Sequence, residues 1–213
     1  MPRRRAAPGA ALRRLRLVLG LTAAYFIAEV IGGAVDYAPG WPGAEAFDGR
    51  LEFRNASLYA GGRARVLGNV SEDVVVTIPD LRRPVLTIDA NTEGPLGDVL
   101  EFLLTAPPIA DYLGPDYARL RAPDGLARVR LDLDIPLPDT AAYRIDACLE
   151  VSEGTLSLEG FGPTATDVFG SITLADGVVS GDGIQATFLE GPAFADVRTV
   201  SSDGYRTQLD LRG

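Results

Sequence analysis

The sequence predicts a mainly β protein with long antiparallel strands and one short helical insertion. Three observations predict this fold class: an unusually long strand-like alternation, a set of Asp-Gly pairs that favour hairpin turns, and an internal repeat of strand and turn sequence. The chain has 213 residues, enough for one large or two small domains with an apolar core.

The longest alternation lies in residues 126–137, where apolar and polar or charged side chains follow one another from Arg128 onward. Side chains of a strand point to opposite faces in turn, so this segment is predicted to be one strand with an apolar face and a charged face. At roughly 3.3 Å per residue, it would be about 40 Å long. A strand of this length needs long neighbours.

The rest of the chain offers such neighbours between turn signals. Five Asp-Gly pairs predict hairpin turns: Asp48-Gly49, Asp124-Gly125, Asp176-Gly177, Asp182-Gly183 and Asp203-Gly204. Gly61-Gly62 and the Gly181–Gly183 triplet are also predicted turns. The candidate strands are 48–54, 56–60, 63–68, 73–79, 84–91, 126–137, 142–151, 154–159, 168–174, 177–180, 183–189, 193–200 and 205–211.

An internal repeat organises the chain. Residues 29–53 align without a gap with residues 150–174, at a constant offset of 121 positions, and pairs such as Glu29 and Glu150 or Gly49 and Gly170 are identical. Because the second copy consists of strand and turn sequence, residues from about 26 to 37 are predicted to be a strand as well. We therefore expect a first β-module at 25–141, a second, incomplete β-module at 142–213, and a piece of a longer repetitive protein or a shortened relative.

A helical insertion is predicted within the first module, at residues 95–113. Pro95 suits a first helical position, and Leu96, Val99, Leu100 and Leu103 form one apolar stripe before Pro107-Pro108 ends the helix. A second short turn is expected at 109–113. Two interpretations remain open: a cap over one end of the apolar face, or a site for a specific partner.

Residues 1–24 form a basic and then apolar N-terminal segment. Six Arg residues lie in the first sixteen positions, and the apolar run that follows reaches twelve residues before Glu29 interrupts it. A spanning helix needs about 20 apolar residues. The segment is therefore compatible with a membrane anchor, a signal sequence or a misassigned start.

Composition excludes several classes of chemistry. The chain has no His and no Lys, which excludes Ser-His-Asp, Cys-His and Ser-Lys nucleophilic sites. Cys148 is the only cysteine, so no intrachain disulfide and no Cys/His metal cluster is expected. Asp132 and Asp134 form a D-x-D pattern that could hold a cation, but a solvated strand face explains it more simply. We expect no catalytic site, no metal and no cofactor.

Charge excludes nucleic acid as a partner. Beyond the first sixteen residues, 14 Arg stand against 29 acidic residues, a net charge of −15. Phosphate backbones require a basic surface, which this remainder does not provide.

Long amphipathic strands must cover their apolar face, and three arrangements remain open. A curled, open sheet would leave an apolar groove that suits acyl chains. A closed sandwich would make the protein a structural or adhesive interaction module. A glycan-active enzyme would require two carboxyl groups in a cleft flanked by aromatic side chains, and no such pair is singled out by the sequence.

The order and spacing of several motifs resemble those of the AsmA-like family, and within it the YhdP branch. They are VDYAPGWPGAEAFDGRLEF (35–53), the Val-Thr-Ile-Pro-Asp-Leu at 76–81 followed by PVLTID, the helical TEGPLGDVLEFLLTAPPIADYLG (92–114), and GLARVRLDLDIPL (125–137). The second copy, from residue 166 to 192, is similar to that branch's next repeat. The resemblance covers about residues 25–213.

This resemblance implies a curled sheet that forms a β-groove, in a non-enzymatic envelope protein of the bacterial periplasm that is attached to the inner membrane. It implies phospholipid transport between the inner and outer membranes, with phospholipid acyl chains as ligand. Further repeats, other envelope proteins and the inner membrane, through the N-terminal segment, are its expected contacts. The residues expected to face lipid are Val74, Val76, Ile78, Leu86, Ile88, Val129, Leu131, Leu133 and Ile135.

Overall fold

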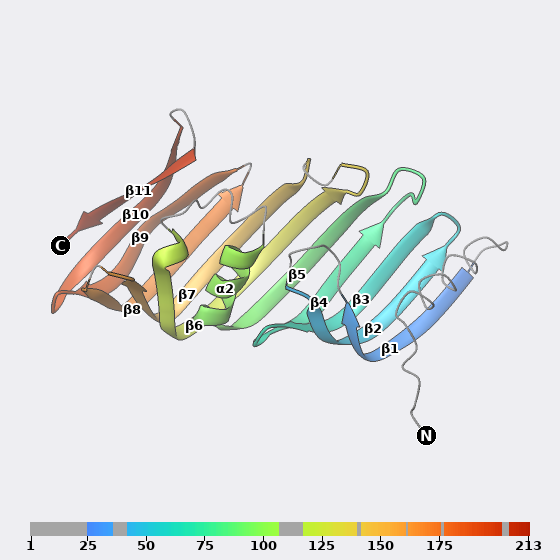
Figure 1. Ribbon diagram of the computed structural model, residues 1–213, viewed down its shortest axis with the longest axis horizontal. Helices are drawn as coiled ribbons and strands as arrows, with labels where there is room; N and C mark the ends of the chain where they lie inside the picture. The colour runs from blue at the N-terminus through green and yellow to red at the C-terminus, as the bar shows by residue number, and fades with distance from the viewer. Residues whose placement is uncertain are drawn as a thin grey trace, which may run out of the picture.

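Eleven strands form one antiparallel sheet in which every strand pairs with its neighbours in the chain (Figure 1). The computed structural model describes residues 25–35, 42–106, 117–139, 142–160, 162–175, 177–201 and 205–213. The strands are β1 (Tyr25–Val35), β2 (Ala44–Arg54), β3 (Ser57–Val66), β4 (Asn69–Ile78), β5 (Val85–Pro95), β6 (Leu120–Pro136), β7 (Arg144–Leu158), β8 (Thr164–Ala175), β9 (Val178–Phe188), β10 (Gly191–Ser201) and β11 (Tyr205–Arg212).

The predicted fold class is confirmed: a mainly β chain, long antiparallel strands in a curled sheet, a module repeated at 121 residues and one short helix. The described residues form a single sheet, so they do not build the two-sheet sandwich of the alternative interpretation. Helix α2 (Leu96–Thr105) lies between β5 and β6 and packs on one face of the sheet (Figure 1). A 3₁₀ turn, η1 (Tyr117–Arg119), precedes β6. The predicted turn at 109–113 and the N-terminal segment 1–24 lie outside the described residues.

Strand β6 is the longest, with 17 residues, and it runs between β5 and β7. Its alternation places Leu133 on the same face as Ile88 of β5 and Ile145 of β7, because these residues are direct cross-strand partners. The opposite, outer face carries Asp132, paired with Asp89 and Asp146. The apolar rows therefore continue from strand to strand without a change of face.

Three of the five predicted Asp-Gly turns are wrong, because they lie inside strands. Asp48-Gly49 is in β2, Asp124-Gly125 in β6 and Asp182-Gly183 in β9, in each case beside a shift of the pairing register. Gly125 and Gly183 have φ values of 120° and 65°. A β-bulge of the G1 type places glycine in the left-handed backbone that hairpin turns also use, so the two features share a sequence signal. The Gly61-Gly62 turn is wrong for a simpler reason: β3 continues straight through it.

The hairpin predicted at Asp176-Gly177 is confirmed, since Ala175 and Val178 pair across it and Gly177 has a φ of 73°. Asp203-Gly204 lies outside the described residues. Bulges also merge pairs of predicted strands. Glu153, with φ 53°, lies inside β7, which keeps Ile145 and Val151 on the apolar face before the bulge and Leu156 on it afterwards.

The repeat extends well beyond the segments that align in sequence. When 121 is added to the residue numbers of β1 to β5, the resulting ranges coincide closely with those of β7 to β11. Backbone conformation follows the offset too: Gly32 and Glu153 have φ values of 61° and 53°, and Ala46 and Asp167 have values of 50° and 49°. At this offset α2 and β6 correspond to positions after residue 213. β6 and β7 pair along most of their length, so the proposed boundary at 141/142 falls inside one continuous sheet and the division into modules stays a prediction.

The core lies between α2 and the middle of the sheet. Leu96 and Val99 of the helix pack with Ala127 of β6, Val151 of β7 and Val168 of β8. A second cluster joins Ala106, just after the helix, to Leu133, Ile135 and Ile145. The helix therefore covers the apolar face over β6 to β8, reaches β5 through Phe102, and leaves most of the face over β2 to β4 uncovered by helix.

Candidate functional site: an apolar groove beside the helix

The nine residues predicted to face lipid all lie on one face of three adjacent strands, β4, β5 and β6. Cross-strand pairing joins Val76 to Ile88 and Ile88 to Leu133, and it joins Leu86 to Ile135. One row further along, Ala90 lies between Val74 and Leu131. Residues far apart in the sequence thus form a continuous apolar wall.

A cavity of about 410 Å³ lies over this wall and is bordered by α2. Seven of the nine predicted residues line it: Val74, Val76, Leu86, Ile88, Val129, Leu131 and Leu133. Ile135 is instead buried beneath Ala106 and the end of the helix, and Ile78 is buried outside the cavity, where it pairs with Leu58. The volume lies within the range of about 300–1,000 Å³ that is usual for small-molecule sites.

Thirteen further residues line the cavity and were not predicted: Ala44, Phe47, Leu51, Leu58, Ala60, Ala64, Val66, Asn69, Ser71, Ala90, Thr92, Val99 and Phe102. Those of β2 and β3 belong to alternating strands, so the period-two pattern could have found Leu51, Leu58 and Ala60. Val99 belongs to the predicted apolar stripe of the helix, for which the sequence leaves both a cap and a partner site open. Asn69, Ser71 and Thr92 are polar, so the alternation of apolar residues does not predict that they line the cavity.

Helix α2 forms one boundary of the cavity because some of its apolar side chains pack on the sheet and others border the cavity. Leu96 and Leu103 pack onto the sheet core, whereas Phe102 lines the cavity, and Val99 contributes to both. Most of the apolar residues that line the cavity from β2 to β5 are half-buried, whereas Phe47, Ala64 and Ala90 are buried. A partly exposed apolar wall that is bordered on one side by a helix forms an open groove, and the helix is one side of this groove.

The polar residues of the cavity are gathered where β4 begins. Asn69 and Ser71 are exposed by 3% and 4%, and Ser71 Oγ lies 2.5 Å from Thr92 Oγ1 of β5. The carboxamide oxygen of Asn69 is buried and has no hydrogen-bond partner among the described residues. The other seventeen lining residues are apolar, so this group of three is the one polar feature of the cavity wall.

The outer face of the same strands is charged and solvated. Arg128 contacts Glu93 at 3.1 Å and Glu150 at 3.8 Å, with all three side chains more than half exposed. Thr87 Oγ1 donates a 2.7 Å hydrogen bond to Asp134 of the D-x-D pattern. Exposed ion pairs of this kind contribute about 0–1 kcal/mol each, so they keep the face soluble more than they hold the sheet together.

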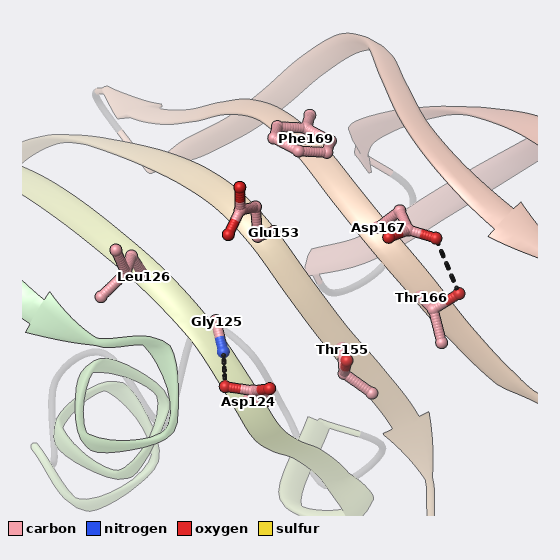
Figure 2. A pocket seen from close by; sticks show the side chains of 8 residues that line it. All are labelled: Asp124, Gly125, Leu126, Glu153, Thr155, Thr166, Asp167 and Phe169. Atoms are coloured by element: carbon pink, nitrogen blue, oxygen red, sulfur yellow. Dashed lines mark hydrogen bonds between the residues drawn. The ribbon is translucent and has the colours of Figure 1, made fainter.

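A second concavity, of about 400 Å³, lies on the outer face over β6, β7 and β8 (Figure 2). It contains the carboxylates of Asp124, Glu153 and Asp167, each from a different strand, beside the exposed Leu126 and Phe169. Asp124 accepts from the backbone N–H of Gly125 at 2.8 Å, and Asp167 accepts from Thr166 at 3.2 Å. Among the described residues no three His, Cys, Asp or Glu side chains are placed to hold a metal ion.

A family model described as YhdP protein matches residues 25–213. The chain belongs to the YhdP family. This confirms the resemblance stated above, and the YhdP family is a family of envelope proteins. Comparison with curated proteins and with solved structures gave no match. In the part of the chain that the structure describes, every helix is too short or too polar to cross a membrane.

Proposed function

We propose that this chain is a non-enzymatic groove segment of a periplasmic protein attached to the inner membrane, and that it binds acyl chains during phospholipid transport between the inner and outer membranes. The observation that carries the proposal is the cavity: about 410 Å³, bordered by one helix, with seventeen apolar residues among the twenty that line it. Family membership supports the same function.

The affinity of such a groove follows from the hydrophobic effect. Each methylene transferred from water to an apolar surface contributes about 0.8 kcal/mol, so about ten buried methylenes correspond to binding at micromolar concentration. An apolar wall without directional contacts binds chains of different length and unsaturation. Its apolar part also lets a chain slide along the wall, because apolar contacts are non-directional.

The adjacent Val75 and Val76 of β4 provide a matched pair for the test. Both side chains are half-buried, but Val76 pairs with Ile88 in the groove, whereas Val75 pairs with Asp89 on the outer face. Val76→Gln therefore places an amide in the path of an acyl chain, and Val75→Gln places the same amide on the polar face.

The experiment is to purify the full chain and both variants without detergent and to quantify co-purifying lipids by mass spectrometry. We expect phospholipid with the parent chain, a several-fold loss in Val76→Gln and no loss in Val75→Gln. Absence of phospholipid from the parent chain, or equal losses in the two variants, would contradict the proposal.

A further inference from the structure

The polar residues at the start of β4 are out of place in an apolar cavity. Asn69, Ser71 and Thr92, here called the polar step, interrupt an otherwise apolar wall, and two of the three are almost completely buried. A buried polar group that lacks a hydrogen bond costs free energy, so at Asn69, whose carboxamide oxygen has no partner among the described residues, an apolar side chain would be more stable unless something binds there.

The backbone around the polar step leaves room for the amide. Gly94 of β5 lies beside Asn69, and a Cβ added at Gly94 would stand 2.3 Å from the Asn69 carboxamide oxygen and 2.9 Å from its Cα. The oxygen thus occupies the space over β5 that a side chain would otherwise fill, on the face that lines the cavity. It has no partner among the described residues.

The hydrogen-bonding capacity of the polar step defines its complement. Ser71 and Thr92 share one hydrogen bond, so the hydroxyl that accepts it still has its own proton to donate. Asn69 offers an acceptor. Because no charged side chain lines the cavity, the complementary group must donate and accept while staying uncharged. A hydroxyl group does both.

The second copy of the repeat has no polar step. At the offset of 121 positions, Asn69, Ser71 and Thr92 correspond to Glu190, Pro192 and Gly213, all of which are exposed. The sheet forms in that copy without buried amide or hydroxyl groups at these positions. The polar step therefore belongs to the first copy, the one whose apolar face lines the cavity.

We propose that the polar step binds the uncharged hydroxyl group of a lipid whose chain fills the cavity. This inference rests on the proposed function, since it needs an acyl chain in the groove. When that chain displaces water from the wall, the Asn69 oxygen gains a partner only if the lipid carries a donor at this level. The hydroxyl belongs either to the end of the chain, as in an acylglycerol, or to the chain itself, as in a hydroxylated acyl group.

Two matched pairs of soluble probes test the proposal on the full chain by displacement of a fluorescent fatty-acid analogue. Dodecanol and dodecyl methyl ether differ in a donor at the chain end, and methyl beta-hydroxydodecanoate and methyl dodecanoate differ in a hydroxyl along the chain. We expect the hydroxyl-bearing member of one pair to bind about tenfold more tightly than its partner, which corresponds to one buried acceptor satisfied or left unpaired. The pair that shows the preference identifies the source of the hydroxyl.

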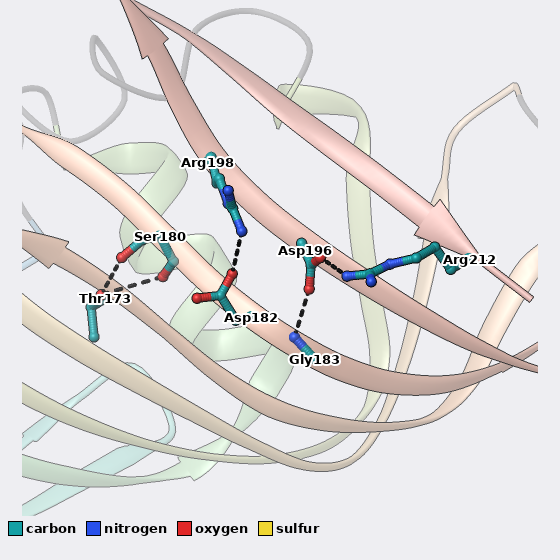
Figure 3. Close-up of polar contacts among 7 residues, drawn as sticks. All are labelled: Thr173, Ser180, Asp182, Gly183, Asp196, Arg198 and Arg212. Atoms are coloured by element: carbon teal, nitrogen blue, oxygen red, sulfur yellow. Dashed lines mark hydrogen bonds and ion pairs between the residues drawn. The ribbon is translucent and has the colours of Figure 1, made fainter.

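Variants locate the preference. Asn69→Leu and, separately, Ser71→Ala should bring the ratio of the two affinities close to one while leaving the methyl ether and the methyl ester bound. Thr173 and Ser180 provide the control, because their hydroxyl oxygens lie 2.8 Å apart on β8 and β9 but on the outer face (Figure 3). Ser180→Ala should keep the full preference.

The outcomes separate this inference from the proposed function. If both members of each pair bind equally well, or if Asn69→Leu and Ser71→Ala keep the preference, the polar step does not recognise a hydroxyl, although the groove still binds chains. If no probe displaces the analogue, the groove itself is not a chain-binding site, and both proposals fail.

Discussion

The two copies of the repeat share a backbone but differ in what covers their apolar face. Val76, Ile88 and Ala90 of the first copy correspond to Val197, Leu209 and Leu211 of the second. In the first copy these positions are buried or half-buried in a groove bordered by α2 and β6, whereas Leu209 and Leu211 are exposed by 56% and 60%. Because β11 is an edge strand of the described sheet, the comparison concerns what α2 and β6 add to the first copy: they border its apolar wall and turn it into a cavity.

The largest effect on stability should follow from shortening Leu133, which packs against the end of the helical insertion on the apolar face of the sheet. Leu133 of β6 is exposed by only 1% and packs among Ala106, Ile135 and Ile145, so Leu133→Ala should lower the free energy of unfolding by about 3 kcal/mol. Leu209→Ala in the uncovered copy should lower it by less than about 1 kcal/mol. Urea unfolding of both variants measures the difference, and equal effects would show that the second wall is covered after all.

A second effect separates two glycines that correspond in the repeat. A Cβ at Gly62 would lie 2.3 Å from the backbone oxygen of Asp48, so Gly62→Ala should destabilise by about 2 kcal/mol through overpacking. A Cβ at Gly183 meets nothing within 4 Å, but its φ is +65°, so Gly183→Ala should cost about 1 kcal/mol of backbone strain. Thermal unfolding of the two variants tests the order, and a larger loss for Gly183→Ala would contradict it.

The second copy has a buried, ion-paired carboxylate at a position where the first copy has an apolar side chain. Asp196 of β10 is buried, accepts a 2.8 Å hydrogen bond from the Gly183 backbone N–H and pairs with Arg212 of β11 (Figure 3). Its counterpart in the first copy is Val75. Asp196→Ala should lower the free energy of unfolding by about 1.5 kcal/mol, because the Gly183 N–H loses its acceptor. The exposed pair of Arg198 with Asp182, at 3.0 Å, serves as control, and Asp182→Ala should change stability by less than about 0.5 kcal/mol.

The smallest effect concerns the corresponding bulges in β1 and β7. Gly32 and Glu153 share a left-handed backbone, which glycine adopts without strain and glutamate does not. Glu153→Gly should therefore raise the free energy of unfolding, by about 0.5–1 kcal/mol, and Asp167→Gly should do the same in β8. A decrease in stability for both variants, measured by chemical denaturation, would show that the side chains contribute more than the strain costs.

The alternation of apolar and polar residues predicted most of the fold and the larger part of the groove. It placed Val129, Leu131 and Leu133 on one face because the strand period is a local property of the chain. It failed at bulges, where one extra residue reverses the period and where Asp-Gly is as favourable as in a turn. The polar step could not be predicted, because Asn69, Ser71 and Thr92 are ordinary surface residues in a sequence and only pairing across β4 and β5 buries them together.

The topology has a consequence for how this sheet forms. Because every strand pairs only with its neighbours in the chain, contacts are local for an all-β protein, and contact order stays low. The entropy cost of closing loops is then small at each step, because each new strand adds one hairpin. Folding can begin at any hairpin and spread to either side, as in solenoid proteins. A sheet built this way can lengthen by whole 121-residue repeats without altering its cross-section, so the length of the apolar wall and the size of its cavity can evolve independently.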